Sequence, residues 1–312
     1  MKILFLVNKE TYQTKMSRVR FHGIRALEKI ANVRYWGLNW PNYNVNLTVQ
    51  QNLDNRQDKF DMCIAYKPLE LKNFKDINIP KCIRYNEMYN VDWTLKEIKE
   101  SGGQLVICHH LNDFEQYQKM NIPKVKFVYI GHCAEKTIFK NYNIPKEYDI
   151  LIAGCISRHY PLRNKFLQLL PFLRKKYKCH QHPHPGYDLD DAHTDRYLKE
   201  MAIAINKARI TLTDTGLPRS RYGKYIEIPM CGTSAICGDL PDDKADDYNY
   251  IIEVTNSLTA PEILDKISYY LDNEDKRLEK VQKGIEFASK YSQEHYAERL
   301  LKEINLYLNK VL

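Results

Sequence analysis

Short apolar runs alternate with longer amphipathic stretches along most of the chain. The first run is Ile3-Leu-Phe-Leu-Val7, and similar runs recur through both halves of the sequence. Continuous apolar runs of this length are typical of strands that are buried on both faces of a parallel sheet. Because segments with a helical repeat lie between most of these runs, the pattern predicts an α/β fold built on parallel sheets.

In the first half, the strands predicted from this pattern are residues 3–7, 33–36, 61–66, 81–85, 105–108 and 125–130, and the helices are residues 17–31, 47–55, 93–100 and 111–120. In the second half, the predicted strands are residues 148–153, 208–213, 233–237 and 250–254. The helices predicted there begin near residue 162 and span 197–207, 260–271, 276–291 and 293–311, with one more ending at Cys231-Gly232. Residues 8–15 and 179–187 are predicted to be loops.

A polar, turn-rich break at residues 141–146 divides the pattern in two. We therefore predict two Rossmann-like domains, residues 1–143 and 144–292. The last helix, residues 293–312, is long enough to pack across both.

Composition narrows the class of protein. The 312 residues are 44% hydrophobic and 28% charged, which is ordinary for a globular protein in water. No apolar run approaches the length of a membrane span, and the run at the start is too short for a signal peptide. Eight cysteines without a CxxC pair indicate reduced thiols. We expect a cytoplasmic protein with neither a bound metal nor a cofactor.

A net charge of +8 favours anionic partners. Nucleotides, nucleic acid and the acidic surface of a membrane all meet this requirement, and the charge alone does not choose among them.

The stretch from residue 218 to residue 240 combines cations with the start of a helix. Arg219, Arg221 and Lys224 come first, and Glu227 follows within a turn. The start of a helix attracts phosphate through its N–H groups and its dipole. Glu227 could accept hydrogen bonds from ribose hydroxyls. The alternative is a surface helix with an i,i+3 ion pair between Lys224 and Glu227.

A second candidate anion site follows the strand predicted at residues 148–153. Gly154 comes directly after this strand, and Ser157, Arg158 and Arg163 surround the start of the next helix. A solvated basic face of that helix is an equally good interpretation.

Polar residues also follow the predicted strands of the first half. They are Glu87, His109, His110, His132 and Glu135. Ligands of parallel sheets bind beyond the carboxyl ends of the strands, so these residues are candidates for a cleft. Each one taken singly is also explained as a satisfied loop group.

The histidine-rich loop Cys179-His-Gln-His-Pro-His-Pro-Gly-Tyr187 has a different interpretation. Its histidines alternate and precede prolines, so they lack the spacing of a helical metal site. A loop that flanks a bound base, with Tyr187 nearby, fits better. Asp188-Leu-Asp190, which follows, is explained as turn and cap chemistry.

The 218–240 stretch and a second motif near the end of the chain together resemble a known family. The Lys224-x-x-Glu227-x-x-x-x-Gly232 helix and the closing Tyr291, Tyr296 and Arg299 resemble GT-B glycosyltransferases, and in particular their CgeB-like, spore-maturation branch. The resemblance implies two Rossmann-like domains that face each other across a cleft, with the C-terminal helix crossing back to the N-terminal domain. The acceptor would bind residues 1–143 and the donor residues 144–292.

The resemblance also implies an activity and a set of site residues. The activity is transfer of a sugar from a nucleoside-diphosphate sugar, with UDP or GDP as nucleotide, without metal and with retention of configuration. Glu227 would hold the donor ribose, and Arg221 and Lys224 would lie near the diphosphate. The acceptor would be a glycan, a protein or a modified nucleic acid, and peripheral contact with a membrane is compatible with the charge.

The catalytic candidates are Glu87, His109 and Glu135. The chain departs from the pattern of retaining enzymes at Arg219, where they carry a glutamate. If transfer inverts configuration, a base must deprotonate the acceptor, and Glu87 or His109 would serve.

Other functions remain open at this point. A sugar-nucleotide epimerase of the same fold would need no acceptor. A nucleic-acid-binding protein, or a glycosyltransferase that modifies DNA bases, would use the positive charge. A GT-B scaffold without activity would bind no donor.

Overall fold

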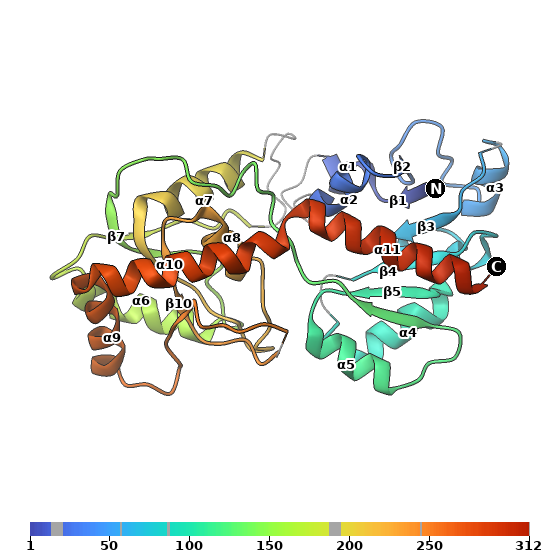
Figure 1. The fold of residues 1–312 in the computed structure, drawn as a ribbon. Coiled ribbons are helices and arrows are strands. Elements are labelled where there is room, and N and C mark those ends of the chain that lie inside the picture. The colour runs from blue at the N-terminus through green and yellow to red at the C-terminus, as the bar shows by residue number, and fades with distance from the viewer. Residues whose placement is uncertain (14–20, 57, 86–87, 187–194, 244, 312) are drawn as a thin grey trace. The chain divides into compact units, whose positions relative to one another are not determined.

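The chain divides into two α/β units (Figure 1). A computed structural model describes all residues except 14–20, 57, 86–87, 187–194, 244 and 312. Unit 1 contains Met1–Gly131 and Glu294–Leu312, and unit 2 contains His132–Leu189 and Thr194–Gln293. The chain therefore begins in unit 1, forms unit 2, and returns to unit 1 with its last helix.

Unit 1 is built on a six-stranded parallel sheet with the strand order β2-β1-β3-β4-β5-β6. The strands are β1 (Lys2–Leu6), β2 (Asn32–Trp36), β3 (Met62–Ala65), β4 (Lys81–Arg84), β5 (Leu105–Cys108) and β6 (Lys126–Tyr129). The helices are α1 (Lys9–Gln13), α2 (His22–Leu27), α3 (Val49–Asp54), α4 (Val91–Ser101), α5 (Leu111–Lys119) and α11 (Gln293–Val311), with two 3-10 turns at Pro68–Glu70 and Phe74–Asp76.

Unit 2 is built on a five-stranded parallel sheet with the strand order β11-β10-β9-β7-β8. The strands are β7 (Tyr148–Ile152), β8 (Cys179–Gln181), β9 (Ala208–Leu212), β10 (Ala235–Gly238) and β11 (Ile252–Glu253). The helices are α6 (Pro161–Leu173), α7 (Arg196–Lys207), α8 (Lys224–Cys231), α9 (Ala260–Asp272) and α10 (Glu274–Ala288), followed by a 3-10 turn at Ser289–Tyr291.

These two parallel sheets confirm the predicted fold class. Strands β3, β5 and β10 are buried along their whole length. This burial explains why they read as unbroken apolar runs instead of alternating ones. All eight cysteines are free, and five of them are buried.

Two predicted loops contain regular structure. Residues 9–13 form α1, a single short helical turn without a buried residue. Residues 179–181 form β8, an edge strand whose side chains are only partly covered or exposed. Both elements lack the apolar side chains from which the other elements were recognised, so the prediction of loops was wrong at these two places. Elsewhere, most boundaries moved by one or two residues.

No helix among the described residues is both long and apolar enough to cross a lipid bilayer.

Helix α11 is joined to unit 1 through Tyr296. Figure 1 shows α11, in red, lying across the strands of this unit. The Tyr296 hydroxyl bonds to Arg84 at the end of β4 and to His109 after β5, at 2.7 and 3.0 Å. The tyrosine ring lies directly against Gly23 of α2, where an added Cβ would come within 2.2 Å of it.

This contact reverses the usual effect of replacing a helical glycine. Gly→Ala inside a helix normally stabilises by about 0.5–1 kcal/mol. Here we expect Gly23→Ala to lower the free energy of unfolding by about 1–3 kcal/mol, because the new methyl group overlaps the Tyr296 ring. Urea denaturation of the two proteins measures the difference.

The control is the same substitution made in a Tyr296→Ala background. Without the ring, Gly23→Ala should be neutral or stabilising. Equal effects of Gly23→Ala in both backgrounds would show that the two residues are not in contact.

Candidate functional site

The candidate site lies at the carboxyl edge of the unit 2 sheet. From β7 the chain goes to β8 on one side of this strand and then to β9 on the other. Neighbouring connections therefore leave β7 and β9 in opposite directions, and the loops after these strands part. Parallel sheets bind ligands at such a switch point.

The loop after β7 is shaped by Gly154. This residue has a φ of +108°, and an added Cβ would lie 2.6 Å from Nη1 of Arg163. A side chain at this position would be both strained and obstructed. Glycine thus lets the loop backbone lie directly on the Arg163 guanidinium, which donates a hydrogen bond of 2.6 Å to the Cys155 carbonyl.

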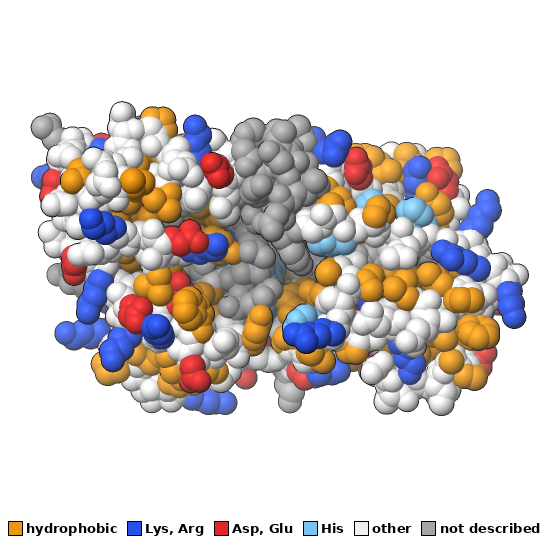
Figure 2. Space-filling view, turned by 180° about the vertical axis from the view of Figure 1, so that it is seen from behind, with side chains coloured by type: hydrophobic (Ala, Val, Ile, Leu, Met, Phe, Trp, Pro, Cys, Tyr) orange, Lys and Arg blue, Asp and Glu red, His pale blue; other side chains and the backbone are white. Residues whose placement is uncertain are grey.

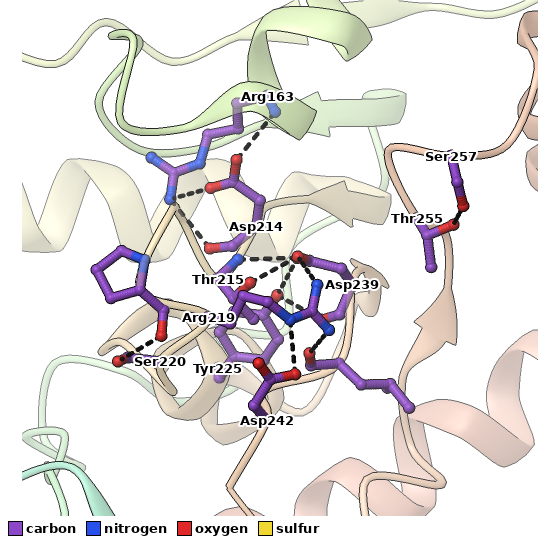
Figure 3. A network of polar contacts seen from close by, with 12 residues as sticks. Arg163, Asp214, Thr215, Arg219, Ser220, Tyr225, Asp239, Asp242, Thr255 and Ser257 are labelled. Carbon is purple, nitrogen blue, oxygen red and sulfur yellow. Dashed lines mark hydrogen bonds and ion pairs between the residues drawn. The ribbon is translucent and has the colours of Figure 1, made fainter. Parts of the chain in front are cut away.

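A buried ion pair joins the first turn of α6, which follows the β7 loop, to the loop after β9 (Figure 3). Nη2 of Arg163 lies 3.0 Å from Oδ1 of Asp214, and the side chains are 3% and 1% exposed. The backbone N–H of Arg163 donates to the other carboxylate oxygen at 3.1 Å. Burial raises the pKa of Asp214, while the Arg163 charge and hydrogen bond act in the opposite direction. The pair therefore holds the two sides of the switch point at a set distance from each other.

A second carboxylate organises the loop after β9 from the end of β10. Asp239 accepts hydrogen bonds from the backbone N–H and the hydroxyl of Thr215, at 2.8 and 2.6 Å. The hydroxyl of Tyr225, on α8, donates to the Asp239 carbonyl at 2.7 Å. Figure 3 shows Asp239 between these groups and Arg219, whose guanidinium bonds to Asp242 at 2.6 Å. The start of α8 is thereby tied to the strands behind it.

The start of α8 carries the Lys224–Glu227 ion pair. The two side chains are in direct contact and are 17% and 14% exposed. The Glu227 carboxylate lies back over the first turn of the helix. Its Oε1 would be 3.0 Å from a Cβ added to Gly223. Among the described residues, no side chain caps this helix start. A cation, a carboxylate and a helix N-terminus therefore meet at one place.

Two histidines that follow β8 lie within reach of the Lys224 charge. The backbone of His182 bonds to Ile152 of β7, and its ring packs against Tyr197 of α7. Burial, followed by the charges of His180, Lys224 and His184, lowers the pKa of His182 to about 4. Burial and the Lys224 charge also lower the pKa of His184. Both rings are thus uncharged at neutral pH beside a cationic site.

The structure brings several predicted donor-site residues to one edge of the sheet. They are Gly154, Ser157, Arg158, Arg163, Lys224 and Glu227. Within this group, Arg158 is exposed, whereas Arg163 is enclosed by its pairing with Asp214. The position of Arg163 indicates that it supports the loop backbone.

Arg221, which the resemblance implies lies near the diphosphate, is enclosed in the structure. Its side chain is 2% exposed and bonds to Asp246 at 2.5 Å. The guanidinium lies 4.2 Å from the centre of the Tyr291 ring. A buried charge needs a counter-charge, which Asp246 supplies, and the Phe287 and Tyr291 rings lie against the guanidinium.

The structure describes two of the three catalytic candidates, one in each unit. His109 belongs to unit 1, is buried, and bonds to Tyr296. Glu135 belongs to unit 2, where its carboxylate accepts hydrogen bonds from the backbone and hydroxyl of Thr137 at 3.2 and 2.9 Å and from Gln293. The contacts with Thr137 indicate that Glu135 stabilises a turn. Glu87 and the predicted donor-site residue Tyr187 lie outside the described residues.

A metal site is not evident in the part of the chain that the structure describes. No three His, Cys, Asp or Glu side chains there are arranged to hold a metal ion.

The sequence prediction did not identify Asp214 and Asp239 as site residues. Both follow the ends of buried strands, β9 and β10. The rule that identified polar residues after the strands of unit 1 would have identified them too.

The low pKa of His182 predicts how this site responds to acid. The unfolded chain binds a proton near the ordinary value of 6.5, whereas the folded chain resists it until about 4. The free energy of unfolding therefore falls as the pH decreases through this window. We expect His182→Gln to lose less stability than the parent protein between pH 7 and pH 4.5, as measured by urea denaturation.

The same pair of proteins at pH 8 provides the control, because the imidazole is neutral in both states there. Any difference between them at pH 8 reports packing alone. Identical losses of stability on acidification would contradict the burial of this ring.

Known structures share this fold over the whole chain. Anabaena HepE in complex with UDP and glucose aligns with a TM-score of 0.61 and 10% identity, covering 98% of this chain and 99% of that one. The E. coli trehalose-6-phosphate structure bound with UDP-2-fluoro glucose gives a TM-score of 0.66 and 10% identity, covering 97% and 99%. A glycosyltransferase from Rickettsia africae gives 0.62 and 12%, covering 98% of each chain.

Sequence comparisons add nothing to this likeness. No family model matches the chain, and no curated protein matches it. At these identities the structural likeness establishes the fold: two parallel-sheet α/β domains of the kind found in GT-B glycosyltransferases.

Proposed function

We propose that this protein is a glycosyltransferase that takes its sugar from a UDP-sugar. The observation that carries the proposal is the Lys224–Glu227 pair at the start of α8, beside the switch point of unit 2. A diphosphate needs cations and N–H donors, and a ribose needs a carboxylate acceptor close by. The relatives in fold that are bound with UDP and UDP-2-fluoro glucose suggest the nucleotide.

Unit 2 would bind the donor. The Lys224 ammonium and the first N–H groups of α8 would face the diphosphate, and Glu227 would accept hydrogen bonds from the ribose hydroxyls. The backbone of the Gly154 loop, with Ser157 and Arg158 nearby, would approach the phosphates from the β7 side. Because Lys224 already neutralises much of the Glu227 charge, the pair must open when the donor enters.

The chemistry would be displacement of UDP at the anomeric carbon. An acceptor hydroxyl forms the new C–O bond, the bond to the diphosphate breaks, and the electron pair leaves with UDP. Lys224 and the helix dipole would stabilise the negative charge that develops there, without a metal ion. The hydroxyl proton would go to the departing phosphate if configuration is retained, or to Glu87 or His109 if it is inverted.

The acceptor would bind unit 1, and the closing helix supports the finer resemblance. Tyr296 of this helix bonds to the ends of β4 and β5, and Tyr291 packs on Arg221. Both tyrosines belong to the motif that resembles the CgeB-like branch, so we extend the proposal to that branch.

A nucleic-acid-binding protein is a weaker alternative. Figure 2 shows one face of the molecule, on which Lys and Arg side chains are spread out and do not gather into one patch. A nucleic-acid surface would concentrate them along the path of the phosphates.

Nucleotide binding tests the proposal directly. We expect UDP to raise the melting temperature more than GDP, ADP, TDP or CMP, without added magnesium. At one hundred times its dissociation constant, a ligand stabilises by about 2.7 kcal/mol. Glu227→Ala should weaken UDP binding by a factor of about 10 to 150, since hydrogen bonds to a charged group contribute about 1.5–3 kcal/mol.

Glu279→Ala is the matched control. Glu279 forms the same kind of helix ion pair, with Lys283 at 2.7 Å, on α10 of the same unit. This variant should bind UDP as the parent protein does. Equal UDP affinity of Glu227→Ala and Glu279→Ala would refute the ribose assignment, and absence of binding by any nucleotide would refute the donor site.

His182 and His184 report the same event from inside the site. The positive charge of Lys224 helps to hold their pKa values down. A bound diphosphate would offset that charge, so both pKa values should rise in the presence of UDP. An NMR titration of the imidazole signals measures this shift, and unchanged values at saturating UDP would place the nucleotide away from Lys224.

A further inference from the structure

Arg84 is a buried cation at the carboxyl end of β4 in unit 1. Its side chain is 4% exposed. Nε donates to the Tyr296 hydroxyl at 2.7 Å, and the guanidinium carbon lies 5.2 Å from the centre of the Tyr296 ring. Nη1 is buried and has no hydrogen-bond partner. The tyrosine holds the guanidinium in place but supplies no negative charge.

The other buried arginines of the described chain are neutralised differently. Arg163 pairs with Asp214 at 3.0 Å, Arg221 with Asp246 at 2.5 Å, and Arg277 with Glu274 at 2.7 Å. No ion pair involves Arg84 among the described residues. Burying a charge without a counter-charge costs several kcal/mol. A carboxylate offsets this cost for Arg163, Arg221 and Arg277. Arg84 has no such carboxylate partner among the described residues.

Further polar groups lie at the same place. His109 follows β5, the neighbour of β4, and its Nε2 lies 3.0 Å from the Tyr296 hydroxyl. His110, the next residue, is also buried. Together these groups form a cluster, Arg84–His109–Tyr296, at the sheet edge where parallel strands bind ligands. Guanidinium and imidazole groups bind phosphate and carboxylate oxygens through N–H groups.

The unit that contains this cluster carries an excess of positive charge. Residues 1–131 contain 20 Lys and Arg against 13 Asp and Glu, a difference of +7. Residues 294–312, which also belong to unit 1, contain three of each sign. Unit 2, residues 132–189 and 194–293, contains 24 Lys and Arg against 21 Asp and Glu, a difference of +3, so more than half of the net charge of +8 belongs to unit 1. An excess of this kind draws anionic ligands to the unit.

We infer that Arg84 is the counter-charge for a phosphate or carboxylate group of the acceptor substrate, which is therefore an anionic molecule. The inference rests on the proposed function in one respect: unit 1 takes the acceptor. Because Nη1 is enclosed, the anion reaches it only when neighbouring side chains move, so binding is coupled to a local rearrangement at the end of β4. His109 and Tyr296 position the guanidinium for this contact.

Anion binding to the full chain tests the inference. The probes are inorganic phosphate and acetate, titrated separately by calorimetry in chloride buffer, so that the two headgroups are distinguished. We expect one of them to bind the parent protein and to bind Arg84→Met at least tenfold more weakly. Arg84→Met should also unfold at the same or a higher urea concentration in the absence of the anion, because a cation without a counter-charge has been removed.

Lys126→Met is the matched control. Lys126 lies on β6 of the same sheet and pairs at the surface with Glu303, at 2.8 Å. Its replacement removes one positive charge from unit 1, so the anion affinity should stay within twofold of the parent value. Equal affinities of the parent and Arg84→Met would overturn the inference, as would a strong loss of stability in Arg84→Met without anion, which indicates a structural counter-ion.

NMR of the parent protein keeps the test decisive if Arg84→Met does not fold. The side-chain Nε–H signal of Arg84 should move during the phosphate or acetate titration, and a signal that stays fixed would overturn the inference. UDP affinity is measured on the same samples. Anion binding without UDP binding would refute the proposed function and support the Arg84 site. UDP binding with a fixed Arg84 signal would support the proposed function and refute the Arg84 site.

Discussion

The buried ion pair between Arg163 and Asp214 is the constraint on which the candidate site of unit 2 depends. It joins the first turn of α6, which follows β7, to the loop after β9. The chain reverses its direction across the sheet between these two strands. Removing one partner of such a pair costs about 3–5 kcal/mol, because the other charge stays buried. The Gly154 backbone rests on the same guanidinium. The shape of the β7 loop therefore follows from a charge inside the protein.

Other carboxylates of unit 2 also hold loops or neutralise a buried arginine. Asp239 holds the loop after β9 and the start of α8, and Asp246 neutralises Arg221 behind the helix. These internal charges are paired, and the Lys224–Glu227 pair and the exposed Arg158 lie nearer the surface of the site. The Lys224–Glu227 pair, which can separate when a ligand binds, thus rests on an interior held by paired charges. Such a division suits a site that must be preorganised and still admit a charged ligand.

Unit 1 differs in how it handles charge. Arg84 is buried in this unit beside a tyrosine and a histidine, without a carboxylate among the described residues. The same physical rule, that buried charge needs a counter-charge, explains a closed structural network in one unit and points to a ligand in the other.

The sequence determined the fold class and most of the elements. Buried parallel strands demand apolar residues on both faces, so β3, β5 and β10 could be recognised as runs without knowledge of their neighbours. α1 and β8 were not predicted because they bury almost no apolar side chains. The sequence also determined that Lys224 and Glu227 share a helix turn, since i and i+3 positions are adjacent by geometry.

Only the tertiary structure decided which cations are enclosed. Arg163, Arg221 and Lys224 look alike along the chain, but their partners Asp214 and Asp246 come from 51 and 25 residues away, and no local pattern encodes a contact that the packing of the sheet creates.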